Sequence, residues 1–281
     1  DTLYPKNLTC EILKDPVGID SGIPRHSWNS DWEKRGDFQS AYRILAASSE
    51  EKLAQNQGNL WDSGKVLSDE SLYVPYKGKK LESGDQIFWK VKIWDREGKE
   101  SAWSQSAHWS MGLLEPSDWK GEWIGLDREV GEDKLDTTFT RMSARYLRKE
   151  VRLPKKIKKA TAHVAGLGLF ELYVNGEKIS DAVLAPALAE YPERTYYMSF
   201  DITGQLNNGD NAIGVILGNG RYVGMRIKEI ELYYDETKLT HYGFPKMLAQ
   251  FEIEYEDGTS GTIVSDTSWK ITADGPILAN N

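Results

Sequence analysis

The sequence predicts an all-β protein made of two β-sandwich domains. Its 281 residues are close to twice the roughly 150 residues of a typical domain. Ten tryptophans, 14 tyrosines and 25 glycines interleave with short runs in which polar and apolar residues alternate. This pattern is typical of strands joined by tight turns. Few stretches keep a helical period over three turns, so we expect little helix.

The first domain is expected to span residues 1–112. Its clearest strand is residues 86–94, in which Ile87 and Trp89 share an apolar face and lysines alternate with them. An Asp-Arg-Glu-Gly turn follows, and residues 101–109 are expected to return as the second strand of a hairpin. About 110 residues with strands at this spacing predict an immunoglobulin-like or fibronectin type III sandwich.

The second domain is expected to span residues 113–281, because Pro and Ser interrupt the strand pattern near residue 116. Its expected strands are residues 146–153, 160–165, 169–174, 195–201, 212–217, 247–255 and 262–264. Asn175-Gly176 and Asp257-Gly258 provide two tight hairpin turns. Residues 225–244, charged and rich in tyrosine, are expected to form an insertion or a long loop.

Composition excludes several classes of protein. The 35 Lys and Arg against 43 Asp and Glu give a formal charge of −8, which argues against a nucleic-acid binder. No apolar run approaches the roughly 20 residues of a membrane span. The single cysteine, Cys10, excludes an internal disulfide and a Cys-built zinc site, and is expected to be buried. The four histidines lack metal-ligand spacing, and His163, in an apolar strand, is expected to be a core residue.

Tryptophans offer flat apolar faces on which a sugar can stack. Trp89 shares its strand face with aliphatic residues, which indicates a core position. Trp28, Trp32 and Trp61 stand in turn-like polar surroundings, and each is a weaker candidate for a ligand contact.

Short motifs in the second domain occur in one order along about 130 residues. They are residues 165–176, 184–186, 194–197, 201–203, 209–214, 217–222 and 266–277. Together they resemble the N-terminal β-sandwich region of bacterial α-L-rhamnosidases, glycoside hydrolase family 78. Residues 61–66, 88–91, 94–95 and 101–104 resemble the fibronectin-type module that precedes this region. The resemblance implies a jelly-roll (galactose-binding-like) second domain.

The same resemblance implies where the chemistry lies. Members of the family cleave terminal rhamnose on an (α/α)₆ barrel that follows these modules, and this chain ends at Asn281 without it. Inversion needs a general acid and a general base roughly 6.5–9.5 Å apart, and the motifs that carry them are absent. We therefore expect an inactive, truncated fragment whose partners are the barrel and a rhamnose-containing glycan. A structural scaffold and a free-standing carbohydrate-binding module are the alternatives.

Some jelly-roll modules of this family bind L-rhamnose through calcium, which takes six to eight oxygen ligands. By this resemblance Asp210 and Asn211 are candidate calcium ligands, and Asn175, Asn219 and Arg221 are candidate sugar contacts. The alternative is turn chemistry, because Asn and Asp bond their own backbone in turns.

Two departures from the family pattern bear on sugar binding. Residues 187–190 read Ala-Leu-Ala-Glu where many members carry an aromatic residue and a Thr-Asp pair, and Arg221 stands where an aromatic residue is common. We expect sugar binding at that edge to be altered or lost. The single cysteine leaves the compartment open, and for a rhamnosidase we favour the periplasm or the exterior over the cytoplasm.

Overall fold

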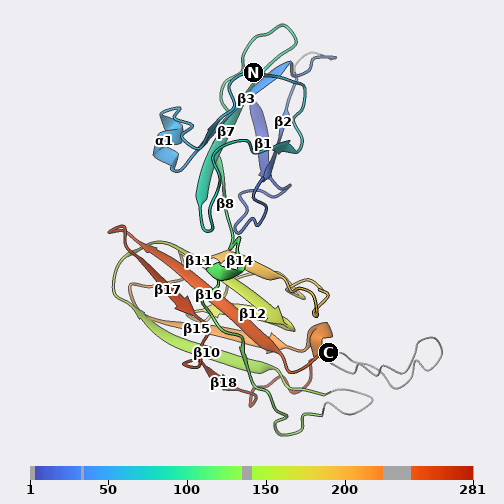
Figure 1. The fold of residues 1–281 in the computed structure, drawn as a ribbon, viewed down its shortest axis with the longest axis vertical. Coiled ribbons are helices and arrows are strands. Elements are labelled where there is room, and N and C mark those ends of the chain that lie inside the picture. Colours follow the sequence, from blue (N-terminus) through green and yellow to red (C-terminus); the bar gives the residue numbers. More distant parts are fainter. Residues whose placement is uncertain (1–3, 33–34, 135–140, 224–241, 281) are drawn as a thin grey trace, which may run out of the picture. The chain divides into compact units, whose positions relative to one another are not determined.

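The computed structural model describes residues 4–32, 35–134, 141–223 and 242–280, and these are almost entirely antiparallel β-structure (Figure 1). The expected all-β class is therefore confirmed. The chain divides into two compact units, residues 1–119 and residues 120–281. Most of the expected loop 225–244 lies outside the described residues. Within the described part of the chain, no helix has the length and apolar character that a membrane crossing requires.

The described residues of the first unit form two sheets and one short α-helix. One sheet has the order β1 (Pro5–Cys10), β2 (Arg25–Ser30) and β6 (Val74–Pro75). The other has the order β4 (Trp61–Asp62), β3 (Ala41–Ala47), β7 (Gln86–Trp94) and β8 (Ala107–Ser110), with β5 (Val66–Leu67) also on β3. The helix α1 (Glu50–Ala54) begins where the Ser49 side chain accepts a hydrogen bond from the Lys52 N–H, a standard N-cap.

The expected return strand over residues 101–109 is only partly right, because β8 begins at Ala107. Before it, Ser101 and Ser104 accept hydrogen bonds through their side-chain hydroxyls from the N–H groups of Ile93 and Val91, at 3.0 and 3.1 Å. A side-chain oxygen therefore replaces the carbonyl that a regular ladder would present. The segment follows β7 without continuing the strand.

Aromatic rings fill the core of the first unit. Trp89 is fully buried, as expected, and so is Trp109. Trp28 and Trp61 are also buried in this core, so the expectation of polar, turn-like surroundings was wrong for both. Trp28 lies on the inner face of β2, and its indole N–H donates to Gln39 at 2.9 Å. Burial of that polar group is tolerated because it has a partner.

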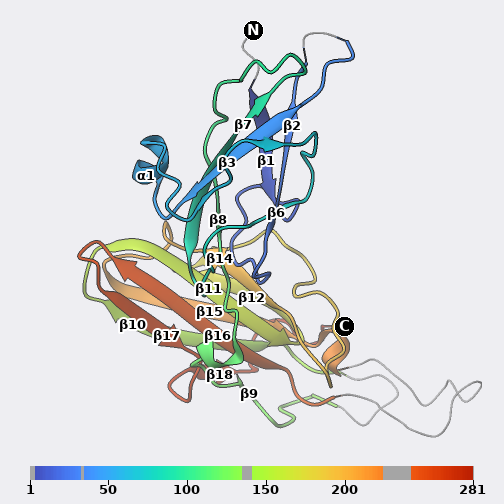
Figure 2. The ribbon, with the colours of Figure 1, turned by 45° about the horizontal axis from the view of Figure 1, so that its top comes forward.

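The second unit is a sandwich of two sheets (Figure 2). The first sheet has the order β13 (Glu177–Lys178), β12 (Leu169–Val174), β15 (Gly209–Gly218), β10 (Arg145–Leu153) and β18 (Lys270–Thr272). The second has the order β14 (Tyr197–Asp201), β11 (Ile157–Leu167), β16 (Lys246–Tyr255) and β17 (Ser260–Val264), with β9 (Ile124–Gly125) paired to β16. Two 3₁₀ turns complete the described elements, η1 (Pro116–Asp118) in the first unit and η2 (Gly220–Val223) in the second.

Strict alternation along the strands builds the core of the second unit. On β15, Ile213, Val215 and Leu217 are buried and the residues between them are half-buried. They pack against residues of the facing sheet such as Phe251. His163 is buried as expected, with its Nδ1 2.7 Å from the Ser199 hydroxyl, but it lies on the opposite face of β11 from the core residues Ala162 and Val164.

An ion pair is buried beside this core. The Arg145 side chain is 0% exposed and donates to the Asp133 carboxylate at 2.7 Å. Asp133 also accepts from the N–H groups of Ser143 and Val130, at 2.8 and 2.9 Å. Burial raises the pKa of Asp133, but these hydrogen bonds outweigh that effect, and the pKa lies below its ordinary value.

Two buried histidines make the stability of the protein depend on pH. Burial lowers the pKa of His26 and of His163 from 6.5 to about 4. Between these values the unfolded chain binds more protons, so the free energy of unfolding falls as pH drops from 6.5 towards 4, by up to about 3 kcal/mol for each group. We expect His26→Leu to flatten this slope in the first unit and His163→Leu in the second. Urea unfolding at several pH values measures it, and unchanged slopes in both variants would contradict the assignment.

Removing one partner of the buried ion pair should be costly. Asp133→Ala leaves the Arg145 charge buried and unpaired, and we expect a loss of about 3–5 kcal/mol in the free energy of unfolding of the second unit. The control is Glu254→Ala, which breaks the exposed pair with Lys158 and should change stability by less than about 1 kcal/mol. Equal effects of the two substitutions would show that the buried pair has no special role.

Candidate functional site

Asn175 and Asn211 lie together at one end of β15. Asn175 follows β12 in the left-handed region, with φ 52°, as an Asn-Gly hairpin requires. Its Nδ2 donates to Asn211 Oδ1 at 2.9 Å and to the Gln205 carbonyl at 2.7 Å. Its Oδ1 accepts the Ala212 N–H at 2.9 Å. The side chain thus ties the hairpin to the start of β15.

Asn211 has no polar atom left for a ligand. It is 4% exposed, and its Oδ1 also accepts the Asn207 N–H at 2.7 Å. Its Nδ2 donates to the carbonyls of Asn207 and Gly209, at 2.8 and 3.0 Å. These bonds hold the turn before β15, as the turn-chemistry interpretation expects.

The residues at this end do not fit a calcium ion. The Asp210 side chain is 82% exposed and pairs with Arg152 at 2.9 Å, whereas Asn211 is buried within the turn. Calcium needs six to eight oxygens directed at one point. Among residues 4–32, 35–134, 141–223 and 242–280, no group of three or more His, Cys, Asp or Glu side chains could hold a metal.

Asn219 and Arg221 lie at the other end of β15, in and beside η2. Ten residues of strand separate the two ends, a distance of about 30 Å. Asn219 is buried, and its N–H donates to Asn280 Oδ1 at 2.6 Å. Arg221 is exposed. The three candidate sugar contacts, with Asn175 at the far end, therefore do not form one site.

A cluster of three tyrosines near η2 was not anticipated from the sequence. The ring centroids of Tyr191, Tyr222 and Tyr242 lie 5.1, 5.5 and 5.8 Å apart. Burial raises the pKa of both Tyr191 and Tyr222. Three tyrosines separated by up to about 50 residues show no local pattern, so only the fold brings them together. Leu188, in the segment that departs from the family pattern, is exposed.

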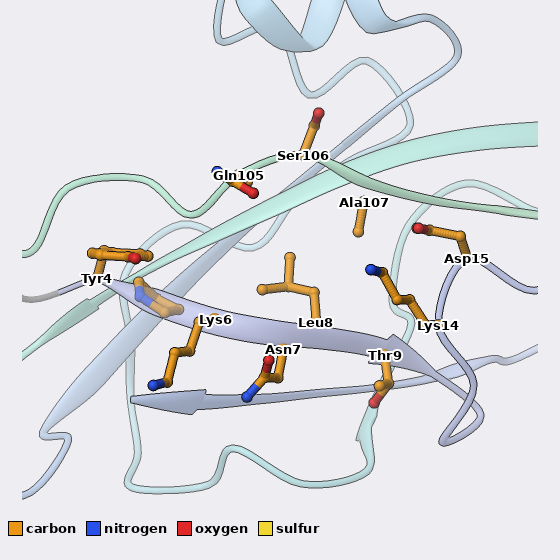
Figure 3. A pocket seen from close by; sticks show the side chains of 11 residues that line it. Tyr4, Lys6, Asn7, Leu8, Thr9, Lys14, Asp15, Gln105, Ser106 and Ala107 are labelled. Atoms are coloured by element: carbon orange, nitrogen blue, oxygen red, sulfur yellow. The ribbon is translucent and has the colours of Figure 1, made fainter. Parts of the chain in front are cut away.

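The first unit has a cavity of about 450 Å³ between β1, the Lys14–Asp15 turn and the start of β8 (Figure 3). Figure 3 shows Leu8 and Ala107 facing each other across it. The Asp15 carboxylate accepts the His108 N–H at 2.9 Å. The lining holds one carboxylate and no histidine or cysteine, so it lacks the pair of carboxyl groups that glycoside hydrolysis commonly uses.

Two family models match consecutive parts of the chain. The Rha78A-like N-terminal immunoglobulin domain matches residues 5–115, and the α-L-rhamnosidase N-terminal domain matches residues 155–281. The chain carries the two domain types of the N-terminal region of α-L-rhamnosidases. Both domain types that the sequence motifs suggested are thereby confirmed in that order.

Sequence matches to α-L-rhamnosidases extend over nearly the whole chain. One from Formosa agariphila is 38% identical over 280 residues, which is 95% of this chain and 29% of the relative. One from Alteromonas sp. is 36% identical and spans 95% of this chain and 28% of the relative. The chain therefore spans less than a third of the length of these curated relatives.

Solved structures of the family agree with the fold. The α-L-rhamnosidase from Dictyoglumus thermophilum is 40% identical, with a TM-score of 0.85 over 98% of this chain and 30% of that one. The enzyme from Aspergillus terreus is 29% identical, with a TM-score of 0.82 over 99% of this chain and 30% of that one. Both units therefore have the fold of the corresponding region in these α-L-rhamnosidases.

The Asn175–Asn211 contact should support the fold without a metal. We expect Asn211→Ala to lower the free energy of unfolding by about 1–3 kcal/mol, because it leaves buried backbone groups unpaired. Asp210→Ala, next in the chain but exposed, should change it by less than about 0.5 kcal/mol. Millimolar calcium should leave the thermal midpoint of the unsubstituted chain unchanged. A calcium-dependent rise that Asp210→Ala abolishes would contradict this account.

Proposed function

We propose that the chain is the accessory N-terminal region of an α-L-rhamnosidase that hydrolyses terminal α-L-rhamnose with inversion. The two sandwiches support an (α/α)₆ barrel in another part of the protein, which carries the catalytic groups, and help to shape its cleft. The observation that carries this proposal is the 38% identity to an α-L-rhamnosidase across both domains, over 95% of this chain. A rhamnose-containing glycan is the substrate of the whole protein under this proposal.

The carboxyl groups of the chain support an accessory role. An inverting glycosidase needs a general acid whose pKa is raised so that it stays protonated. Among the described residues, every carboxyl group with a clearly shifted pKa is shifted downward: Glu11, Asp62, Asp133, Glu171, Asp257 and Asp266. Arginine, lysine and hydroxyl partners cause these shifts by stabilising the ionised form. Such groups are poor proton donors at neutral pH.

The Asn175–Asn211 contact favours a second candidate function, that of a structural scaffold. Such a scaffold would bind no sugar through these two asparagines. Both side chains are committed to the backbone of the turn. A ligand would have to displace these bonds to use them. Under this alternative the chain contributes only surface and stability to the barrel.

The accessory role can be tested by exchanging the region between relatives. The purified 281-residue chain should release no aryl alcohol from an aryl α-L-rhamnoside above the rate without protein. A chimera in which this chain replaces the corresponding region of the Formosa agariphila relative should hydrolyse that substrate, since the two regions are 38% identical. Deletion of the region from the relative should lower its thermal midpoint or its activity.

Either of two results would contradict the accessory role. One is hydrolysis by the isolated chain at an enzyme-like rate. The other is a deletion variant of the relative that is as active and as stable as the intact enzyme. Inactivity of the chimera beside an active intact relative would show that this chain cannot replace the N-terminal region.

A further inference from the structure

The outer face of the sheet β13-β12-β15-β10-β18 carries a groove formed by two adjoining hollows. They measure about 440 and 550 Å³, and Arg148 and Ala212 line both. The first hollow has Tyr146 of β10 and Tyr173 of β12 in its lining, with Gly214 of β15 between these strands. The second hollow continues along β10 and β15 towards Asp210. The groove therefore crosses three strands of one sheet.

Strand register creates the first hollow. Gly214 pairs with Arg148 on β10 and with Tyr173 on β12, and the neighbouring Ile216 pairs with Tyr146. Side chains at these paired positions point to the same face of the sheet. Gly214 alone contributes no side chain, so the space between the two tyrosines stays open.

The fold does not require glycine at position 214. A Cβ added there would meet no atom closer than 3.8 Å, and the backbone is not in the left-handed region. Gly168 is the opposite case, because its φ is 122° and a Cβ would lie 2.2 Å from the Gly218 carbonyl oxygen. Glycine inside a strand is unfavourable for the fold and is found where a ligand approaches the backbone. The fold therefore explains the glycine at position 168 and does not explain the glycine at position 214.

Charges around the groove are paired on the surface. Arg148 lies 2.7 Å from Glu150, and Arg152 lies 2.9 Å from Asp210. The third pair, Lys178 with Glu171, lies beside Tyr173, whose hydroxyl donates to Glu171 at 2.8 Å. With both signs present in equal number, the groove has no excess charge that would attract a polyanion or a polycation. A purely apolar partner would bury these charges at a cost.

We propose that this groove binds a neutral glycan chain, with a sugar ring over Gly214 between the two tyrosines. The C–H face of a sugar packs against tyrosine rings, and its hydroxyls suit the charged groups of the second hollow. That the sugar is rhamnose rests on the function proposed above. The site is separate from the η2 end of the sandwich, and it uses neither Asn219 nor Arg221.

Filling the floor of the groove tests the proposal. The probe is rhamnan, a neutral polymer of α-linked L-rhamnose, in native gels that measure retardation of the 281-residue chain. Gly214→Val should weaken retardation about tenfold or more, since added methyl groups occupy the sugar position. The same variant should unfold at an unchanged or higher urea midpoint, because valine favours strands. Tyr173→Ala should also weaken retardation.

The control is Thr262→Val, which places the same side chain on an exposed position of β17 in the other sheet. It should be retarded as strongly as the unsubstituted chain. Absence of retardation by rhamnan, equal retardation of Gly214→Val and the unsubstituted chain, or stronger retardation by the polyanion polygalacturonate would each overturn the proposal. The chimera assay tests the accessory role independently of the groove, because supporting the barrel does not require sugar binding at this face. Failure of the gel assay would therefore overturn the groove proposal alone.

Discussion

The pairing of β15 on both of its edges determines where the polar groups of the second unit lie. Residues 209–217 pair with all of β10 on one edge, and residues 213–218 pair with β12 on the other. A slip of one residue would turn Ile213, Val215 and Leu217 out of the core, so the buried face fixes the register. With that register set, Gly214 must lie between Arg148 and Tyr173.

Polar side chains close the sandwich at both ends of β15. At one end Asn211 is hydrogen-bonded through both of its side-chain polar atoms. At the other end the Asn280 side chain accepts the Asn219 N–H and donates to the Met142 carbonyl, in the chain that leads into β10. Satisfied polar groups of this kind specify one geometry, because any alternative leaves a buried group unpaired. They stabilise the surfaces around the groove without binding a ligand themselves. The outer face of the sheet between the two ends of β15, where the groove lies, is then the part that remains available to bind a glycan.

Strands with strict alternation could be predicted from the sequence almost to the residue, as β7 and β12 show. The polar strand β2 was missed, and its Trp28 was misplaced, because one buried ring among polar neighbours gives no period-two pattern. The helix α1 is too short to show a helical period. Among the candidate site residues, the contact of Asn175 with Asn211 depends on which strands pair, and that is a property of the whole sheet. The groove was not predicted for the same reason.

Amide chemical-shift mapping with a short neutral rhamnan oligosaccharide tests most directly the claim that the register of β15 places recognition on the open face. The account predicts shifts at residues 146–150, 171–174 and 212–216, which are adjacent only in the observed register. Shifts confined to residues 186–191 and 219–222, at the η2 end, would contradict it.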